Sequence, residues 1–319
     1  MSPLAPLRRP RALVPGDRVA VVAPAGPVPK DLLDAGVAIL ESWGLQVTLA
    51  RHVLDRHPRF DYLAGTDAER AHDFTQAWLA PDIAGVLCAR GGYGVTRMLD
   101  LVDWPALHAV EPKILAGYSD ITALHEAVAT QLGVAGLHAP MVATTAFCED
   151  PATQEGLRRA LVAPEQPTTI GSPQARSLVG GRAHGVTVGG CLSLLPATRG
   201  LPTAQTNIAG GILVLEDVDE ECYRLDRYLT QLRQAGWLDG VAGIAIGSWT
   251  NCLPDPETLA ELVLDRLGDL GVPVATELGF GHGGRTQTVP LGTPATLDAS
   301  TSKPTLTVTE AVGYPARAQ

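Results

Sequence analysis

The sequence predicts an α/β fold in which an N-terminal open parallel α/β sheet domain precedes a smaller C-terminal β-rich α+β domain. In the first half, short apolar runs alternate with amphipathic stretches, as they do in strands joined by crossover helices. The length of 319 residues fits two domains of roughly 150 residues each. Between residues 163 and 177 the periodicity stops, and Pro, Thr, Ser and Gln dominate. We therefore expect domains over 1–162 and 178–319, joined by a linker over 163–177.

The predicted elements of the first half alternate between strand and helix. In order, they are a strand over 18–23, a helix over 30–43, a strand over 45–49, a helix over 67–79, a strand over 83–89, a short helix ending at 101, a strand over 113–116, a helix over 121–132 and a strand over 136–139. Gly44 and Gly133 stand where a glycine commonly ends a helix. Strands that alternate with helices are expected to pair in parallel, with both faces of the sheet covered.

The second half mixes helical and strand patterns. Its predicted elements are a strand over 211–215, a helix over 223–235, a strand over 241–247, a helix over 257–270 and several short strands between 272 and 308. The Thr-rich, β-branched stretch TLTVTEAV near the end indicates a small sheet or barrel.

Composition excludes several classes of protein. Hydrophobic residues make up 45% of the chain and charged residues only 18%, which excludes a disordered chain. The net charge of −10 disfavours a nucleic-acid partner, because phosphate binding favours a basic surface. No stretch of 18 apolar residues is present, so we expect no membrane span. Pro10 and Pro15 interrupt the start of the chain, which disfavours a secretory signal.

The cysteines give no sign of a metal or disulfide framework. Five are scattered along the chain, and none forms a CxxC pair. We therefore expect a cytoplasmic protein with reduced thiols, no metal site and no cofactor.

Two loops that follow predicted strands are the first candidates for a site. Parallel sheets bind ligands beyond the carboxyl ends of their strands. Residues 117–120 (GYSD) have the layout of a nucleophile elbow, in which Ser119 would lie between a strand and a helix. Ser119 could equally be a helix N-cap, and Ile121 replaces the second glycine of the G-x-S-x-G signature.

The second loop is residues 90–94 (RGGYG). It matches neither common nucleotide-binding glycine motif. Its backbone N–H groups could supply part of an oxyanion hole facing Ser119, and a purely structural turn remains an equal alternative.

A serine nucleophile needs a base and a carboxylate that orients it. Of eight histidines, only His282 lies in a glycine-rich loop, over 279–284, and His138 at a strand end is the second candidate. Acidic residues cluster over 216–221, directly after a predicted buried strand. Glu216 stands nearest the strand end, while the residues after Asp217 fit a solvated turn before the next helix.

Short segments occur in a characteristic order along nearly the whole chain. They are APAGP at 23–27, RGGYG at 90–94, GYSD at 117–120, HAPM at 138–141, GG at 189–190, LSL at 192–194, LEDV at 215–218, GHG at 281–283 and VPLG at 289–292. Together they resemble the LD-carboxypeptidase family of serine peptidases, which includes the microcin C immunity peptidases.

The resemblance implies a catalytic triad of Ser119 as nucleophile, Glu216 as orienting carboxylate and His282 as general base. It also implies an oxyanion hole made by the backbone N–H groups of Gly92 and Asp120, and a homodimer. The substrate it implies is a murein tetrapeptide, which loses its terminal D-Ala during cell-wall recycling.

Three points about the substrate stay open. Cys191 and Arg285 depart from the family pattern near the expected substrate pocket. Arg90 or Arg285 could bind the terminal carboxylate of a peptide. An immunity-type amidase that cleaves peptidyl- or aminoacyl-nucleotides is the alternative, and Trp249 could then stack on the base.

A two-domain protein that binds a small anion without chemistry is a third hypothesis.

Overall fold

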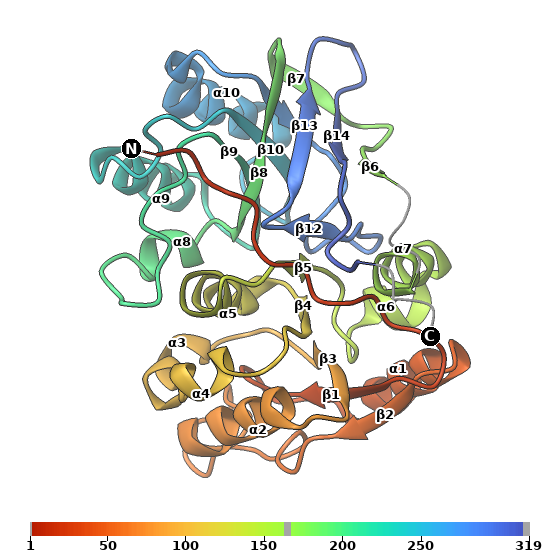
Figure 1. Cartoon of the computed structure of the whole chain (residues 1–319). Helices are drawn as coiled ribbons and strands as arrows, with labels where there is room; N and C mark the ends of the chain where they lie inside the picture. Colours follow the sequence, from red (N-terminus) through yellow and green to blue (C-terminus); the bar gives the residue numbers. More distant parts are fainter. Residues whose placement is uncertain (1, 163–166, 315–319) are drawn as a thin grey trace.

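The computed structural model describes residues 2–162 and 167–314. The chain forms two halves, each built on its own β-sheet with helices packed against it (Figure 1). The sheet of the first half has the order β12-β5-β4-β3-β1-β2, and that of the second half has the order β6-β14-β13-β8-β9-β10-β11-β7. The predicted α/β fold is confirmed.

Five strands of the first sheet pair in parallel, as predicted. They are β1 (Arg18–Val22), β2 (Gln46–Leu49), β3 (Ile83–Cys88), β4 (Ile114–Gly117) and β5 (Gly136–His138). The sixth strand, β12 (Val289–Leu291), comes from the second half of the chain and pairs antiparallel with β5. The expected division at residue 162 therefore separates β12 from the sheet that it completes.

Helices cover both faces of this sheet. They are α1 (Lys30–Ser42), α2 (Asp67–Leu79), α3 (Val95–Met98), α4 (Trp104–His108), α5 (Thr122–Ala127), α6 (Thr145–Glu149) and α7 (Pro151–Val162). Phe74 and Trp78 of α2 belong to the core on one face, and Leu33 and Leu40 of α1 to the core on the other. The aliphatic character of both cores agrees with the 5% aromatic content.

The second sheet is mixed. Its strands are β6 (Thr168–Ile170), β7 (Arg176–Val179), β8 (Arg182–Cys191), β9 (Gly211–Val218), β10 (Gly243–Thr250), β11 (Val274–Thr276), β13 (Pro294–Asp298) and β14 (Thr305–Val308). The four strands β8, β9, β10 and β11 are parallel, and the outer strands are antiparallel. Helices α8 (Leu194–Ala197), α9 (Cys222–Gln234) and α10 (Pro256–Leu267) accompany this sheet. The sequence prediction placed no strand at β8.

The segment expected to link the domains contains parts of this sheet. Residues 163–166 lie outside the described residues. Strands β6 and β7 begin within the expected linker. Because β6 pairs with β14 and β7 pairs with β11, both belong to the second sheet. A linker over all of 163–177 therefore does not fit the described part of this segment.

The two halves are joined at several points. The N-terminal segment, which precedes β1, crosses from the second half to the first (Figure 1). Along it, Leu4 N–H donates to Ala209 O at 2.8 Å, and Arg8 N–H donates to Gly133 O at 2.8 Å. Among the described residues, we find no helix long and apolar enough to cross a membrane.

Candidate active site

Ser119 occupies a strained turn between β4 and α5. Its φ is +66°, a left-handed backbone conformation that residues other than glycine rarely adopt. Within the described residues its Oγ makes no capping hydrogen bond, so the alternative of a simple N-cap is not supported. A sharp turn that exposes a serine beyond a strand is the geometry of a nucleophile elbow.

The RGGYG loop lies directly against this turn. A Cβ added to Gly91 would lie 2.9 Å from Ser119 Cβ, so no larger residue fits there without moving the serine. Gly92 has φ of +111°, which glycine alone adopts readily. The side chain of Asp120 accepts a hydrogen bond from Val95 N–H at 2.8 Å and so joins the two loops. Burial raises the pKa of Asp120 to about 6, although this hydrogen bond opposes the shift.

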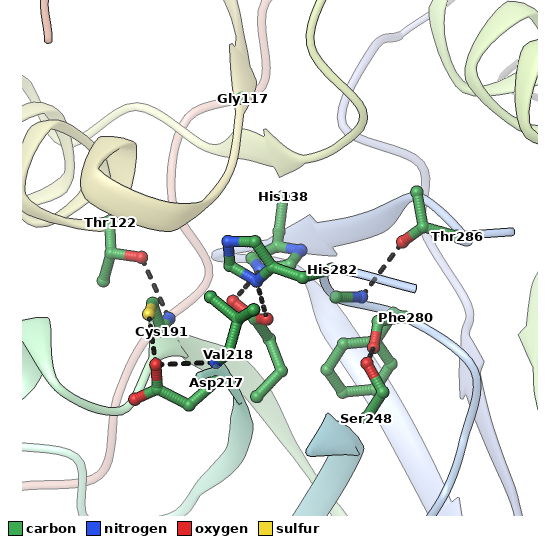
Figure 2. Close-up of polar contacts among 12 residues, drawn as sticks. Gly117, Thr122, His138, Cys191, Asp217, Val218, Ser248, Phe280, His282 and Thr286 are labelled. Atoms are coloured by element: carbon green, nitrogen blue, oxygen red, sulfur yellow. Dashed lines mark hydrogen bonds and ion pairs between the residues drawn. The ribbon is translucent and has the colours of Figure 1, made fainter. Parts of the chain in front are cut away.

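Glu216 and His282 form a close pair. Glu216 lies inside β9, two residues before its end, and is fully buried. Its Oε2 accepts from His282 Nδ1 at 2.6 Å (Figure 2). Burial alone would raise the pKa of Glu216, but hydrogen bonds from His138 and His282 outweigh burial and lower it to about 2. Burial lowers the pKa of His282, and the bond with Glu216 and its charge outweigh that effect and raise it.

His138, the second candidate base, contacts the other oxygen of the same carboxylate. The distance from its Nε2 to Glu216 Oε1 is 3.4 Å. The His138 side chain is 2% exposed, whereas His282 is 15% exposed and lines a cleft of about 460 Å³. Since a general base must reach substrate, His282 is the better placed of the two.

The loop that carries His282 is anchored at both ends. Ser248 Oγ donates to Phe280 O at 3.2 Å, and Gly281 N–H donates to Thr286 Oγ1 at 3.0 Å (Figure 2). Thr286 N–H in turn donates to Thr153 Oγ1 at 3.0 Å, which connects the loop to helix α7 of the first half. The sequence prediction missed Thr153 and Thr286. The only sequence signal is that Thr286 follows the glycine-rich loop.

Tyr118 brings the elbow and the histidine together. Its ring centroid lies 4.7 Å from that of His282, edge to face, and Ser119 is the next residue in the chain. The cleft beside them is bordered by Tyr118, His282 and Gly283 and by residues 144–146 and 149–150. In the described structure Ser119 Oγ makes no hydrogen bond to His282. In unliganded enzymes such bonds are often long and shorten only when substrate binds.

The predicted substrate-binding residues are placed differently from one another. Arg285 Nε lies 3.4 Å from Asp150 Oδ2, and Asp150 borders the cleft. Arg90 is exposed and donates to Pro27 O at 2.8 Å beside the RGGYG loop. Trp249 lies in β10 and packs against the apolar core of the second half, which fits a core residue better than a stacking platform.

One group of potential metal ligands occurs in the part of the chain that the structure describes. His52, Asp55 and Glu69 offer atoms within 4.8 Å of one another. Glu69 already accepts hydrogen bonds from the N–H and hydroxyl of Thr66 in the capping box of α2. This capping role accounts for Glu69 without an ion.

A serine at a strained strand-to-helix turn, beside a buried carboxylate–imidazole pair, is the arrangement found in serine hydrolases. Residues 19–139 match the LD-carboxypeptidase N-terminal domain, and residues 184–297 match the LD-carboxypeptidase C-terminal domain. The chain belongs to the LD-carboxypeptidase family, whose members are serine peptidases. The hypothesis of a binding protein without chemistry is therefore not supported.

Named relatives and a solved structure agree with this assignment. The chain is 57% identical over 300 residues to a Streptomyces coelicolor protein that carries a provisional carboxypeptidase name, with 94% of this chain and 96% of that protein covered. It is 35% identical over 301 residues to the murein tetrapeptide carboxypeptidase of Pseudomonas aeruginosa, with 89% and 94% covered. The muramoyltetrapeptide carboxypeptidase of Oxalobacter formigenes superposes with a TM-score of 0.80 at 27% identity, over 94% of this chain and all of the other.

Proposed function

We propose that this peptidase hydrolyses the amide between an L-centre and the terminal D-amino acid of murein tetrapeptide, with Ser119, Glu216 and His282 as its triad. The observation that carries the proposal is the 2.6 Å contact between Glu216 and His282, next to the strained turn at Ser119. The names of the murein peptidases among its relatives support the substrate class. The proposed setting is cell-wall recycling in the cytoplasm, by a homodimer.

In the proposed reaction, His282 Nε2 takes the proton of Ser119 as its oxygen attacks the carbonyl carbon. Glu216 holds Nδ1–H, fixes the tautomer and stabilises the imidazolium that forms. The backbone N–H groups of Gly92 and Asp120 stabilise the oxyanion. The D-amino acid leaves with the proton from His282, and water then hydrolyses the acyl-enzyme. No step calls for a cofactor.

A cation is needed for the carboxylate at the end of the peptide. Arg285 supports this role best, because it lies beside Asp150 at the edge of the cleft and 71% of its side chain is exposed. Arg90 at the RGGYG loop is the second candidate. Either guanidinium could hold a carboxylate through two parallel hydrogen bonds.

The alternative is an amidase that cleaves peptidyl- or aminoacyl-nucleotides. It needs an aromatic side chain on which a base can stack, and the partly buried Trp249 packs against the core of the second half. Release of D-Ala from murein tetrapeptide, measured beside cleavage of an amide-linked aspartyl-adenylate, separates the two substrates. Cleavage of the second compound alone would reverse the assignment.

The nucleophile is tested with a fluorophosphonate probe. We expect labelling at Ser119, and we expect Ser119→Ala to abolish both labelling and turnover without changing the thermal unfolding curve. Ser42→Ala is the matched control, because Ser42 is exposed on α1 and its hydroxyl only bonds Ile39 O. Labelling elsewhere, or an active Ser119→Ala variant, would rule out the proposed nucleophile.

A further inference from the structure

His138 is a buried titratable group that contacts the proposed triad and that the reaction does not use. It is 1% exposed and ends strand β5, in the sheet of the first half. Glu216, its partner, lies in the sheet of the second half. Figure 2 shows the two imidazoles of His138 and His282 on the same carboxylate.

The direction of the hydrogen bond follows from the carboxylate. The pKa of Glu216 is about 2, so at neutral pH this group is ionised and only accepts. His138 must therefore carry its hydrogen on Nε2, which faces Glu216 Oε1 at 3.4 Å. Its Nδ1 is buried, with no hydrogen-bond partner in the described structure. A hydrogen on Nδ1 would be a buried donor without an acceptor, so Nε2 is the position at which this site satisfies a hydrogen.

We propose that His138 is a positioning residue that holds the second oxygen of Glu216, so that the first oxygen stays aligned with His282 Nδ1. The proposal rests on the proposed triad. Without a donor at Oε1, the carboxylate of Glu216 would be free to rotate about its last side-chain bond. The Nδ1–H of His282 would then lose a fixed acceptor, and with it the orientation that aims Nε2 at Ser119.

The residues packed around Glu216 restrict its space, but the hydrogen bonds that its carboxylate accepts in the described structure come from the two imidazoles. Gly281 lies so close that an added Cβ would be 2.7 Å from Glu216 Oε2. The ring of Phe280 lies 5.9 Å from that of His138, and the ring of Tyr118 lies 5.7 Å from it. These neighbours restrict the position of the two imidazoles, while the polar contacts to the carboxylate come from the imidazoles themselves.

Other buried titratable groups lie near enough to this pair to interact with it through their charges. Burial lowers the pKa of His125 of α5 to about 4 and raises the pKa of Asp217 of β9 to about 6. Burial also raises the pKa values of Tyr118, beside the elbow, and Cys191 of β8. Asp217 and Asp219 each raise the pKa of His282, and none of the groups that shift this pKa is a Lys or an Arg. A change at His138 acts on His282 through Glu216, and Asp217, whose pKa is about 6, is the same in the wild type and in both variants.

Two matched substitutions separate the hydrogen bond from the packing. The amide nitrogen of Gln reaches the position of His Nε2, whereas that of Asn reaches only the position of Nδ1. We therefore expect His138→Gln to keep kcat within about threefold of the wild type and His138→Asn to lower it by about 10- to 100-fold, with KM little changed. Both variants replace the ring with an amide, but Asn is one methylene smaller than Gln, so the free energy of unfolding is measured for both to account for the difference in packing.

The pH profile supplies a readout that a structural role would not move. When Glu216 loses the donor at Oε1 and rotates, His282 loses part of the hydrogen bond that raises its pKa, so the imidazolium becomes less stable. The acidic limb of kcat/KM, and of fluorophosphonate labelling at Ser119, should then move to lower pH in His138→Asn and stay in place in His138→Gln. The Nδ1–H proton resonance of His282 should shift only in His138→Asn.

Equal kinetics for the two variants, or an acidic limb that does not move to lower pH in His138→Asn, would overturn the role of His138. These outcomes leave the triad intact if Ser119→Ala remains inactive. If Ser119→Ala remains active, the proposed function fails instead. Should His138→Asn not fold, a comparison of His138→Gln with the wild type still decides, because a loss of activity in a folded His138→Gln would contradict the proposal.

Discussion

Thr286 N–H donates to Thr153 Oγ1 at 3.0 Å, and this bond ties the loop of His282 to helix α7 of the other half of the molecule. Both residues are buried. The same hydroxyl donates to Asp150 Oδ2 at 2.7 Å, so Thr153 orders the edge of the cleft as well as the loop. The position of the candidate base thus depends on a contact between elements 133 residues apart.

Thr153→Val should reduce both stability and turnover. Valine keeps the shape of threonine but leaves Thr286 N–H buried without an acceptor, which costs about 1–3 kcal/mol. We expect a lower free energy of unfolding and a kcat/KM reduced by more than tenfold, because the loop of His282 loses its anchor. Thr153→Ser keeps the hydroxyl and should retain most activity. Equal activity in the two variants would show that the hydroxyl does not position the loop.

Gly91→Ala should impair catalysis by displacing Ser119. The added Cβ would lie 2.9 Å from Ser119 Cβ, closer than real contacts allow, and 3.1 Å from its Oγ, a tight contact. A shift of the nucleophile by even about 1 Å can lower the rate by about 100-fold. Denaturant unfolding and kcat/KM, measured together, separate displacement from loss of the fold.

Gly156→Ala is the matched control for Gly91→Ala. Gly156 lies in α7, and an added Cβ there meets nothing within 4 Å. Alanine in a helix should stabilise the protein by about 0.5–1 kcal/mol and leave kcat/KM unchanged. If Gly91→Ala behaved like Gly156→Ala, the close contact between the RGGYG loop and Ser119 would have no part in catalysis.

Some elements could be predicted accurately from local sequence. The helix expected over 67–79 has those bounds, because it combines a regular apolar face with a Thr66–Glu69 capping box. Strand β8 was missed, although it lies in the middle of the second sheet. Its glycines, Gly185, Gly189 and Gly190, weaken the usual strand signal. The structure explains two of them, because added Cβ atoms on Gly185 and Gly189 would collide with the backbone at the start of β9 and within it.

The candidate site was harder to predict from local pattern. Glu216 and His282 are 66 residues apart, and no local periodicity brings them together. Only the order of the short family segments pairs them with Ser119, and their roles stay predictions. The supporting contacts of His138, Thr153 and Thr286 depend on how the two sheets meet. Neighbouring sequence holds no information on such contacts between distant elements.

Glu216→Gln should lower kcat by about 1,000- to 10,000-fold. The amide keeps the size of the carboxylate but cannot hold the imidazolium, as the loss of the acid shows in other serine triads. Since the charge of Glu216 raises the pKa of His282, its removal should move the acidic limb of kcat/KM to lower pH. This shift has the same direction as the one expected for His138→Asn, because both substitutions weaken the bond between Glu216 and His282.

Asp219→Asn is the control for that loss of charge. Asp219 also raises the pKa of His282, but it is exposed and makes no hydrogen bond to the imidazole in the described structure. Asparagine also tolerates its left-handed φ of +56°. A small effect of Asp219→Asn beside a large effect of Glu216→Gln would assign the role to the hydrogen-bonded carboxylate. Similar effects would reduce Glu216 to a general source of charge.

The wild-type pH profile tests the base directly. The pKa of His282 is raised above its ordinary 6.5, since the hydrogen bond and charge of Glu216 outweigh the opposing effect of burial. A general base must be neutral, so kcat/KM should be full at pH values above this raised pKa and fall as pH drops through it. The midpoint should therefore lie above 6.5. A profile that stayed flat from about pH 5 to 8, with Ser119 still labelled by the probe, would mean that another group takes the proton of Ser119.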